Sequence, residues 1–218
     1  MLHAIGGNNV ITPYGVADGI GVEISPNLMV PPAPPNLLVA SNTFSNAAWN
    51  KLDSTVATTS VTPGPGGATP VWKLAPAATT AEHYLYQTVA GLSIGDIVAA
   101  SIYFKPDDTY FFGQLSIQNV TQTEGCAMGI WADPAGLKPG QDWGGEWGTS
   151  LDYVNGGAEA VEPGWCRVWV AAKLLTVTSV RFRFSITSGS FLGNPAKGLY
   201  IFGAQLEKAQ APGLYKGT

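Results

Sequence analysis

The stretch from Glu124 to Trp165 gathers the side chains best suited to chemistry in this 218-residue chain. It is rich in tryptophan and carboxylate residues, and Lys138 is its only basic residue. Indole faces offer flat apolar area to the C–H side of a sugar ring, while carboxylates and amides bond its hydroxyls. We therefore predict a glycan-binding site formed by Trp131, Gln141, Asp142, Trp143, Glu146, Trp147 and Tyr153.

The densest cluster of such side chains in this stretch is residues 141–147, which place two indoles and two carboxylates around a Gly-Gly pair. Glycine is typical of loops, so we expect a loop that brings these four side chains together. An alternative is that the indoles cap the domain core or form a contact between subunits. The residue types alone leave both interpretations open.

The carboxylates Asp142 and Glu146 also raise the alternative of glycoside hydrolysis. That reaction needs two carboxyl groups about 5–10 Å apart, one of them with a raised pKa. A four-residue separation in a glycine-rich loop permits many distances, and carboxylates that only bind sugar look the same in sequence. No nucleophile elbow, phosphate-binding loop, metalloprotease or dinucleotide motif is present. We expect no catalytic residues, and we keep a glycan-degrading enzyme as a minor alternative.

Metal and cofactor sites have few candidate ligands. The chain has two histidines and two cysteines, too few for a Cys/His zinc site. An oxygen-ligated cation at Asp107-Asp108 stays open, although a solvated turn is the default interpretation. His83 opens a predicted strand and is expected to have a hydrogen-bonded structural role. We expect no cofactor and no metal.

The two thiols, Cys126 and Cys166, are expected to be buried and free. Both fall in strand-like segments, so a bridge between them is the alternative. Two cysteines cannot form a disulfide scaffold for a chain of this size.

Composition excludes several classes of protein. Eleven basic and 15 acidic residues give a net charge of −4, which argues against nucleic-acid binding. Hydrophobic residues make up 45% and charged residues only 12%, the opposite of a disordered chain. No run of about 18 apolar residues predicts a membrane span. The first basic residue is Lys51, so a secretory signal peptide is not expected.

The chain divides at the proline cluster of residues 31–35, which favours a stiff polyproline II spacer. The residues before it contain no lysine or arginine but many apolar side chains. We predict that residues 1–35 form an extended anchoring arm, which pairs its backbone with the sheet edge of a partner. A flexible N-terminus with one edge strand is the alternative. The predicted anchoring residues are Ile5, Val10, Ile11, Tyr14, Val16, Ile20, Val22, Ile24, Leu28 and Met29.

Residues 36–218 show strand patterns one after another, separated by Gly, Pro, Asn and Asp turns. In residues 180–186, Val180 and Phe182 alternate with Arg181 and Arg183, as expected of a strand with one apolar face. The other predicted strands cover residues 56–61, 84–89, 97–104, 111–118, 126–131, 166–174 and 199–206. About nine or ten short strands predict one all-β domain, an antiparallel jelly-roll β-sandwich.

Five segments also resemble motifs of one family. They are residues 36–51 with Asn36-Leu37-Leu38, 72–74, 83–87, Gly164-Trp165-Cys166-Arg167-Val168, and the closing 200–207 with Gly203-Ala204-Gln205-Leu206-Glu207. In order and spacing they are similar to the carbohydrate-binding-module-like jelly-roll domains of bacteriophage virion proteins, especially tail and head fibres. The resemblance covers about residues 36–218.

The resemblance implies a jelly-roll sandwich, a location in the virion and no catalytic residues. It implies that Trp49 and Trp165 pack in the core and that Gln205 and Glu207 tie the last strand to its neighbours. Cys166 stands where the family usually has tyrosine, and residues 141–147 look like an addition.

Together these observations predict a bacteriophage virion structural protein, either a capsid decoration or head fibre or a tail-associated protein. The arm is expected to dock on capsid or tail proteins of the same particle, while the jelly roll is displayed outward with host-surface glycans as a candidate ligand. We further expect a homo-oligomer, with a trimer as the guess. The main alternative is a polysaccharide-binding adhesin module.

Overall fold

The computed structural model describes residues 33–107, 112–133, 136–162 and 164–218. The predicted anchoring residues, from Ile5 to Met29, lie outside these ranges, as do His3 and Asp108. The arm and the domain division after residue 35 therefore stay predictions. Within the described ranges, no helix is long and apolar enough to span a membrane.

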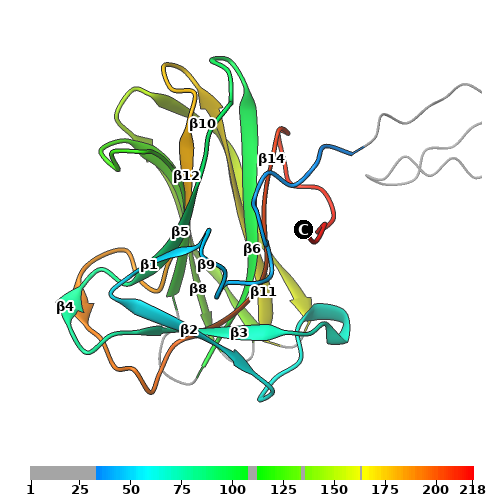
Figure 1. Ribbon diagram of the computed structural model, residues 1–218, viewed down its shortest axis with the longest axis vertical. Coiled ribbons are helices and arrows are strands. Elements are labelled where there is room, and N and C mark those ends of the chain that lie inside the picture. The colour runs from blue at the N-terminus through cyan, green and yellow to red at the C-terminus, as the bar shows by residue number, and fades with distance from the viewer. Residues whose placement is uncertain (1–32, 108–111, 134–135, 163) are drawn as a thin grey trace, which may run out of the picture. The chain divides into compact units, whose positions relative to one another are not determined.

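Two six-stranded antiparallel sheets face each other as a sandwich (Figure 1). Sheet 1 has the order β1 (Asn50–Leu52), β5 (Tyr84–Val89), β12 (Val180–Ser185), β7 (Phe112–Asn119), β8 (Gly125–Asp133) and β9 (Gly136–Trp147). Sheet 2 has the order β10 (Leu151–Glu162), β11 (Trp165–Leu174), β6 (Ile97–Pro106), β14 (Leu199–Glu207), β3 (Val71–Pro76) and β2 (Ser54–Thr59). Strands β4 (Thr80–Ala81) and β13 (Phe191–Leu192) form a separate pair, and Pro65–Gly67 forms a 3-10 turn. The prediction of an all-β jelly-roll sandwich is confirmed.

The core lies between the sheets and follows the predicted alternation. Val180, Phe182 and Phe184 of β12 point inward and are fully buried. The ring of Phe182 lies 5.7 Å from that of Trp49, so the segment before β1 closes over the centre of sheet 1. Burying this apolar surface is the main force that holds the two sheets together.

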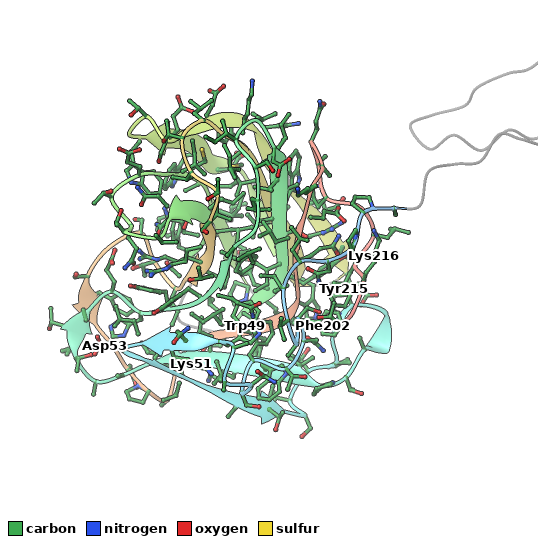
Figure 2. The ribbon with its side chains drawn as sticks, turned by 45° about the horizontal axis from the view of Figure 1, so that its top comes forward. Trp49, Lys51, Asp53, Phe202, Tyr215 and Lys216 are labelled. Carbon is green, nitrogen blue, oxygen red and sulfur yellow. The ribbon has the colours of Figure 1, made fainter. Side chains whose placement is uncertain are left out.

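Trp165 is buried as expected, but it does not lie in the main core. It points to the outer face of sheet 2, where it forms a second cluster with Val71 and Phe202. Tyr215 covers this cluster, with its ring 5.3 Å from that of Phe202; Figure 2 shows the two side chains together.

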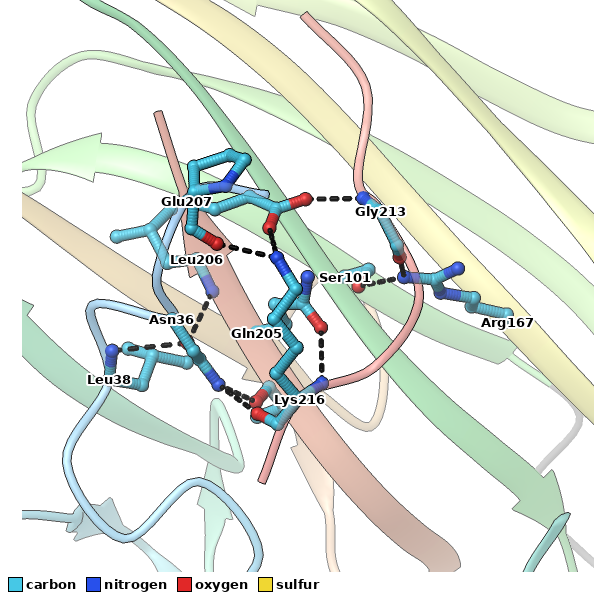
Figure 3. A network of polar contacts seen from close by, with 11 residues as sticks. Asn36, Leu38, Ser101, Arg167, Gln205, Leu206, Glu207, Gly213 and Lys216 are labelled. Carbon is cyan, nitrogen blue, oxygen red and sulfur yellow. Dashed lines mark hydrogen bonds and ion pairs between the residues drawn. The ribbon is translucent and has the colours of Figure 1, made fainter. Parts of the chain in front are cut away.

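The outer face of sheet 2 is bound to the segment that follows β14 (Figure 3). Gln205 accepts a hydrogen bond from the Lys216 backbone N–H at 3.2 Å, and Glu207 accepts one from the Gly213 backbone N–H. Arg167 donates to the carbonyl oxygen of Gly213 at 2.5 Å. Gln205 and Glu207 therefore tie β14 by their side chains to residues 213–216, the segment that lies beside it.

The chain enters the sandwich on the same side. Asn36 donates to the carbonyl oxygens of Ala204 and Lys216, both at 3.1 Å, and accepts from the Leu206 backbone N–H at 3.0 Å. The Lys216 ammonium group donates to the Pro34 carbonyl oxygen at 2.6 Å and pairs with Glu207 at 3.5 Å. These contacts fix the start of the described chain against sheet 2 (Figure 3).

Candidate functional site

Residues 141–147 do not form a loop, so the prediction of a loop was wrong. They are the second half of β9, an edge strand of sheet 1 that pairs with β8. Glycine is needed in this strand because Tyr153 fills the space beside it: a methyl group on Gly144 would lie 2.5 Å from the Tyr153 hydroxyl oxygen. Glycine inside a strand commonly marks such a close approach.

Strand geometry divides the predicted site residues between two faces of β9. Trp143 and Trp147 project from the outer face of sheet 1, since successive side chains of a strand point to opposite sides. Trp131 of β8 lies on this outer face too, 44% exposed, with its ring 5.2 Å from that of Phe112. Gln141 lies in β9.

Asp142, Glu146 and Tyr153 lie on the other side, where β9 meets β10. Glu146 accepts a hydrogen bond from the Tyr153 backbone N–H. The phenol of Tyr153 packs against the core, and burial raises its pKa, with smaller contributions from Cys126 and Asp142. The structure therefore separates these three residues from the indoles.

Asp142 and Glu146 are separated along β9 rather than brought together by a loop. Asp142 and Glu146 are four residues apart on an extended strand, which corresponds to about 13 Å at ~3.3 Å per residue. Glycosidase carboxyl groups lie about 5–10 Å apart.

The two indoles of β9 lie directly over glycines of the neighbouring strand β8. Trp143 lies opposite Gly129, where an added methyl group would come within 2.6 Å of indole atom Cε2. Trp147 lies opposite Gly125, where a methyl group would come within 2.8 Å of Cζ2. The glycines thus allow both indoles to cover β8, while Trp143 remains 43% exposed to solvent.

These indoles form one side of a hollow of about 520 Å³ on the outer face of sheet 1. Besides the indoles it is lined by polar side chains from β5, β7, β12 and their loops. They are Glu82, Tyr84, Gln114, Gln118, Gln122, Arg183 and Ser188. None of them was among the predicted site residues. The polar faces of β7 and β12 were visible as alternation, but only the sheet order brings them beside β9.

The charged groups of the hollow are paired with each other. Arg183 forms an ion pair with Glu82 at 3.1 Å, donates to the Ser185 hydroxyl at 3.0 Å and lies 3.7 Å over the ring of Tyr84. The Tyr84 hydroxyl donates to Gln122 at 2.9 Å, and burial is the main cause that raises its pKa. The hollow therefore offers neutral hydrogen-bonding groups and aromatic faces.

The remaining candidates have structural roles. The ring nitrogens of His83 contact the carbonyl oxygens of Asp53 and, at 3.1 Å, Phe191, as expected of a buried structural histidine. Asp107 is not a solvated turn residue: it is buried, pairs with Lys73 at 3.3 Å and accepts from the Gly198 N–H at 2.5 Å. Within the described ranges, no group of three or more His, Cys, Asp or Glu residues is arranged to hold a metal ion.

Cys126 and Cys166 are buried and free, as predicted, so they form no bridge. Burial is the main cause that raises the pKa of each thiol to about 12. We expect neither thiol to react with a disulfide reagent at pH 8 in the folded protein, because the reactive thiolate is scarce and covered. A spectrophotometric thiol assay should count two reactive groups per chain only in denaturant. Rapid reaction of the native protein would contradict the burial described here.

Comparisons with known proteins find only distant structural similarity. No protein-family model matches the chain, and no curated protein matches it. Among solved structures, the tailspike protein 4 enzymatically active domain of bacteriophage CBA120 matches with a TM-score of 0.45 and 13% identity, over 80% of this chain and 21% of that one. A Bacteroides thetaiotaomicron protein proposed to bind sugar matches with a TM-score of 0.38 and 12% identity, over 78% and 92%.

Proposed function

We propose that this domain binds carbohydrate on the outer face of sheet 1. One observation carries the proposal: two partly exposed indoles, Trp143 and Trp147, lie over glycines beside a hollow lined by polar groups, whose two charged members, Glu82 and Arg183, pair with each other. Sugar sites combine an apolar floor with a few well-placed polar groups.

Each part of the hollow has a role in this binding. The indole faces stack on the C–H side of sugar rings. The amides of Gln114 and Gln118 donate to and accept from hydroxyl groups. Arg183 is held by Glu82 and Tyr84, so its position is fixed before a ligand arrives, which lowers the entropic cost of binding.

Binding to glycan arrays tests the proposal. We expect Trp143→Ala and Trp147→Ala each to weaken binding about tenfold, which is ~1.4 kcal/mol. Leu192→Ala is a matched control, because Leu192 is 69% exposed and does not line the hollow. Absence of any signal above background for the unaltered protein on broad arrays would refute carbohydrate binding.

We further propose that the domain is displayed on a bacteriophage particle, with residues 1–35 as its anchor. Support comes from the sequence motifs at 36–51, 164–168 and 200–207 and from the apolar leader, which contains no lysine or arginine. Repetition on a symmetric particle makes many weak glycan contacts act together.

Deleting residues 1–30 tests the anchor. We expect particles assembled with the truncated protein to lose it, while the isolated truncated domain keeps its glycan binding. Normal incorporation of the truncated protein would refute the anchoring role. Light scattering of the full chain would test the expected trimer directly.

A further inference from the structure

We infer that the hollow contains two equivalent sugar subsites and that its ligand is a neutral, linear oligosaccharide long enough to span both. This inference rests on the proposed carbohydrate binding and specifies the class of ligand. It comes from the cross-strand register of sheet 1.

Two rows of aligned residues cross the sheet with the same composition. In each row a tryptophan of β9 lies opposite a glycine of β8, which in turn lies opposite a glutamine of β7. The rows are Trp147–Gly125–Gln118 and Trp143–Gly129–Gln114. Each row therefore supplies one aromatic platform and one amide, which is the set of groups that a single sugar ring requires.

The row between them is built from small side chains. Gly145, Ala127 and Ser116 are aligned across β9, β8 and β7. A methyl group added to Gly145 would meet no atom within 4 Å, so the space between the two indoles is open. Ala127 and Ser116 are themselves buried, so this open space is a gap over Gly145 on the edge strand, where a chain can pass along β9 from one platform to the other.

The spacing of the platforms sets the length of the ligand. Trp143 and Trp147 are four residues apart on β9, which places them about 13 Å apart at ~3.3 Å per residue. One pyranose ring cannot stack on both indoles, whereas a chain of roughly three rings along the strand covers this distance. The ligand is therefore a chain segment rather than a single terminal sugar.

The charged groups of the hollow favour an uncharged oligosaccharide over an acidic one. Arg183 already pairs with Glu82, so an acidic sugar would have to displace a carboxylate that is present. In addition, Gln118 is 5% exposed, and its Oε1 atom has no hydrogen-bond partner among the described residues. Because this oxygen is shielded from solvent, a sugar hydroxyl would reach it only after the Gln118 side chain turned outward, and a neutral amide there offers no charge to an acidic sugar.

Calorimetric titration with neutral gluco-, galacto- and manno-oligosaccharides of one to six units tests the inference, with oligogalacturonides as the acidic series. We expect at least one neutral series to bind the full chain about tenfold more tightly at three or more units than at one. Gly145→Leu, which fills the gap without adding an aromatic face, should remove this gain with length and leave the weak binding of the monosaccharide. Gly145→Ala is the matched control and should keep the gain.

The outcomes distinguish a failure of the proposed carbohydrate binding from a failure of the two-subsite arrangement alone. No heat of binding with any neutral or acidic series would overturn carbohydrate binding itself and this inference with it. Equal affinity for all lengths, or unchanged trisaccharide binding by a folded Gly145→Leu variant, would overturn only the two-subsite arrangement. Tighter binding of oligogalacturonides than of every neutral series would overturn the neutral class.

Discussion

Gly129→Val is expected to weaken oligosaccharide binding about tenfold, or ~1.4 kcal/mol, as much as the removal of the Trp143 indole itself. Even the first methyl group at this position would lie 2.6 Å from Cε2 of Trp143 and 2.7 Å from Cζ of Phe112. The Trp143 indole must therefore move away from its position over Gly129 of β8. One of the two proposed subsites then loses its aromatic surface, although no proposed sugar-contacting residue has been changed. Calorimetric titration with the tightest-binding oligosaccharide measures the effect.

The same titration on Gly145→Ala provides the control, since that methyl group enters open space on the adjacent strand. Cooperative unfolding of both variants must be checked by circular dichroism, because valine at a crowded position also strains the sheet. A folded Gly129→Val protein with unaltered affinity would show that the seated indole is not part of the binding surface.

The second large effect concerns stability. Phe182→Ala is expected to lower the free energy of unfolding by about 3–5 kcal/mol, the usual cost of truncating a buried phenylalanine. Phe182 is fully buried at the centre of sheet 1, and its ring lies 5.7 Å from that of Trp49. The cavity would open between two elements that are distant in sequence, where little relaxation can fill it.

Urea unfolding followed by tryptophan fluorescence measures this loss, and Phe182→Leu provides a milder comparison that keeps most of the side-chain volume. For a domain of this size, the alanine variant should also melt about 6–20 °C lower. A change below about 1 kcal/mol would mean that the two sheets do not pack as described.

Strand patterns in the sequence predicted most of the fold. β5, β6, β7, β8, β11, β12 and β14 lie where alternation or apolar runs placed them. β9 and β10 were missed because both contain glycine pairs that are typical of turns. Those glycines are explained by contacts that only the folded chain contains: Gly144 and Gly156 both accommodate the phenol of Tyr153.

The candidate site was predicted only in part, for a related reason. Trp143 and Trp147 stood out by type, and the structure places both on one face. Asp142 and Glu146 were grouped with them because a loop was assumed, whereas a strand sends alternate side chains to opposite faces. Gln114, Gln118 and Arg183 could not be assigned, since their place beside the indoles depends on the sheet order β12-β7-β8-β9.

The position of Asn36 has a consequence for how the domain can be presented. Asn36 and Pro34 are fixed against sheet 2, whereas the indoles project from sheet 1, and the two sheets of a sandwich expose opposite faces. A tether attached at Ala33 itself would therefore start on the side of the sandwich opposite the indoles. On a sensor surface that holds the domain 33–218 by its first residue, we expect the face with Trp143 and Trp147 to point into the solution.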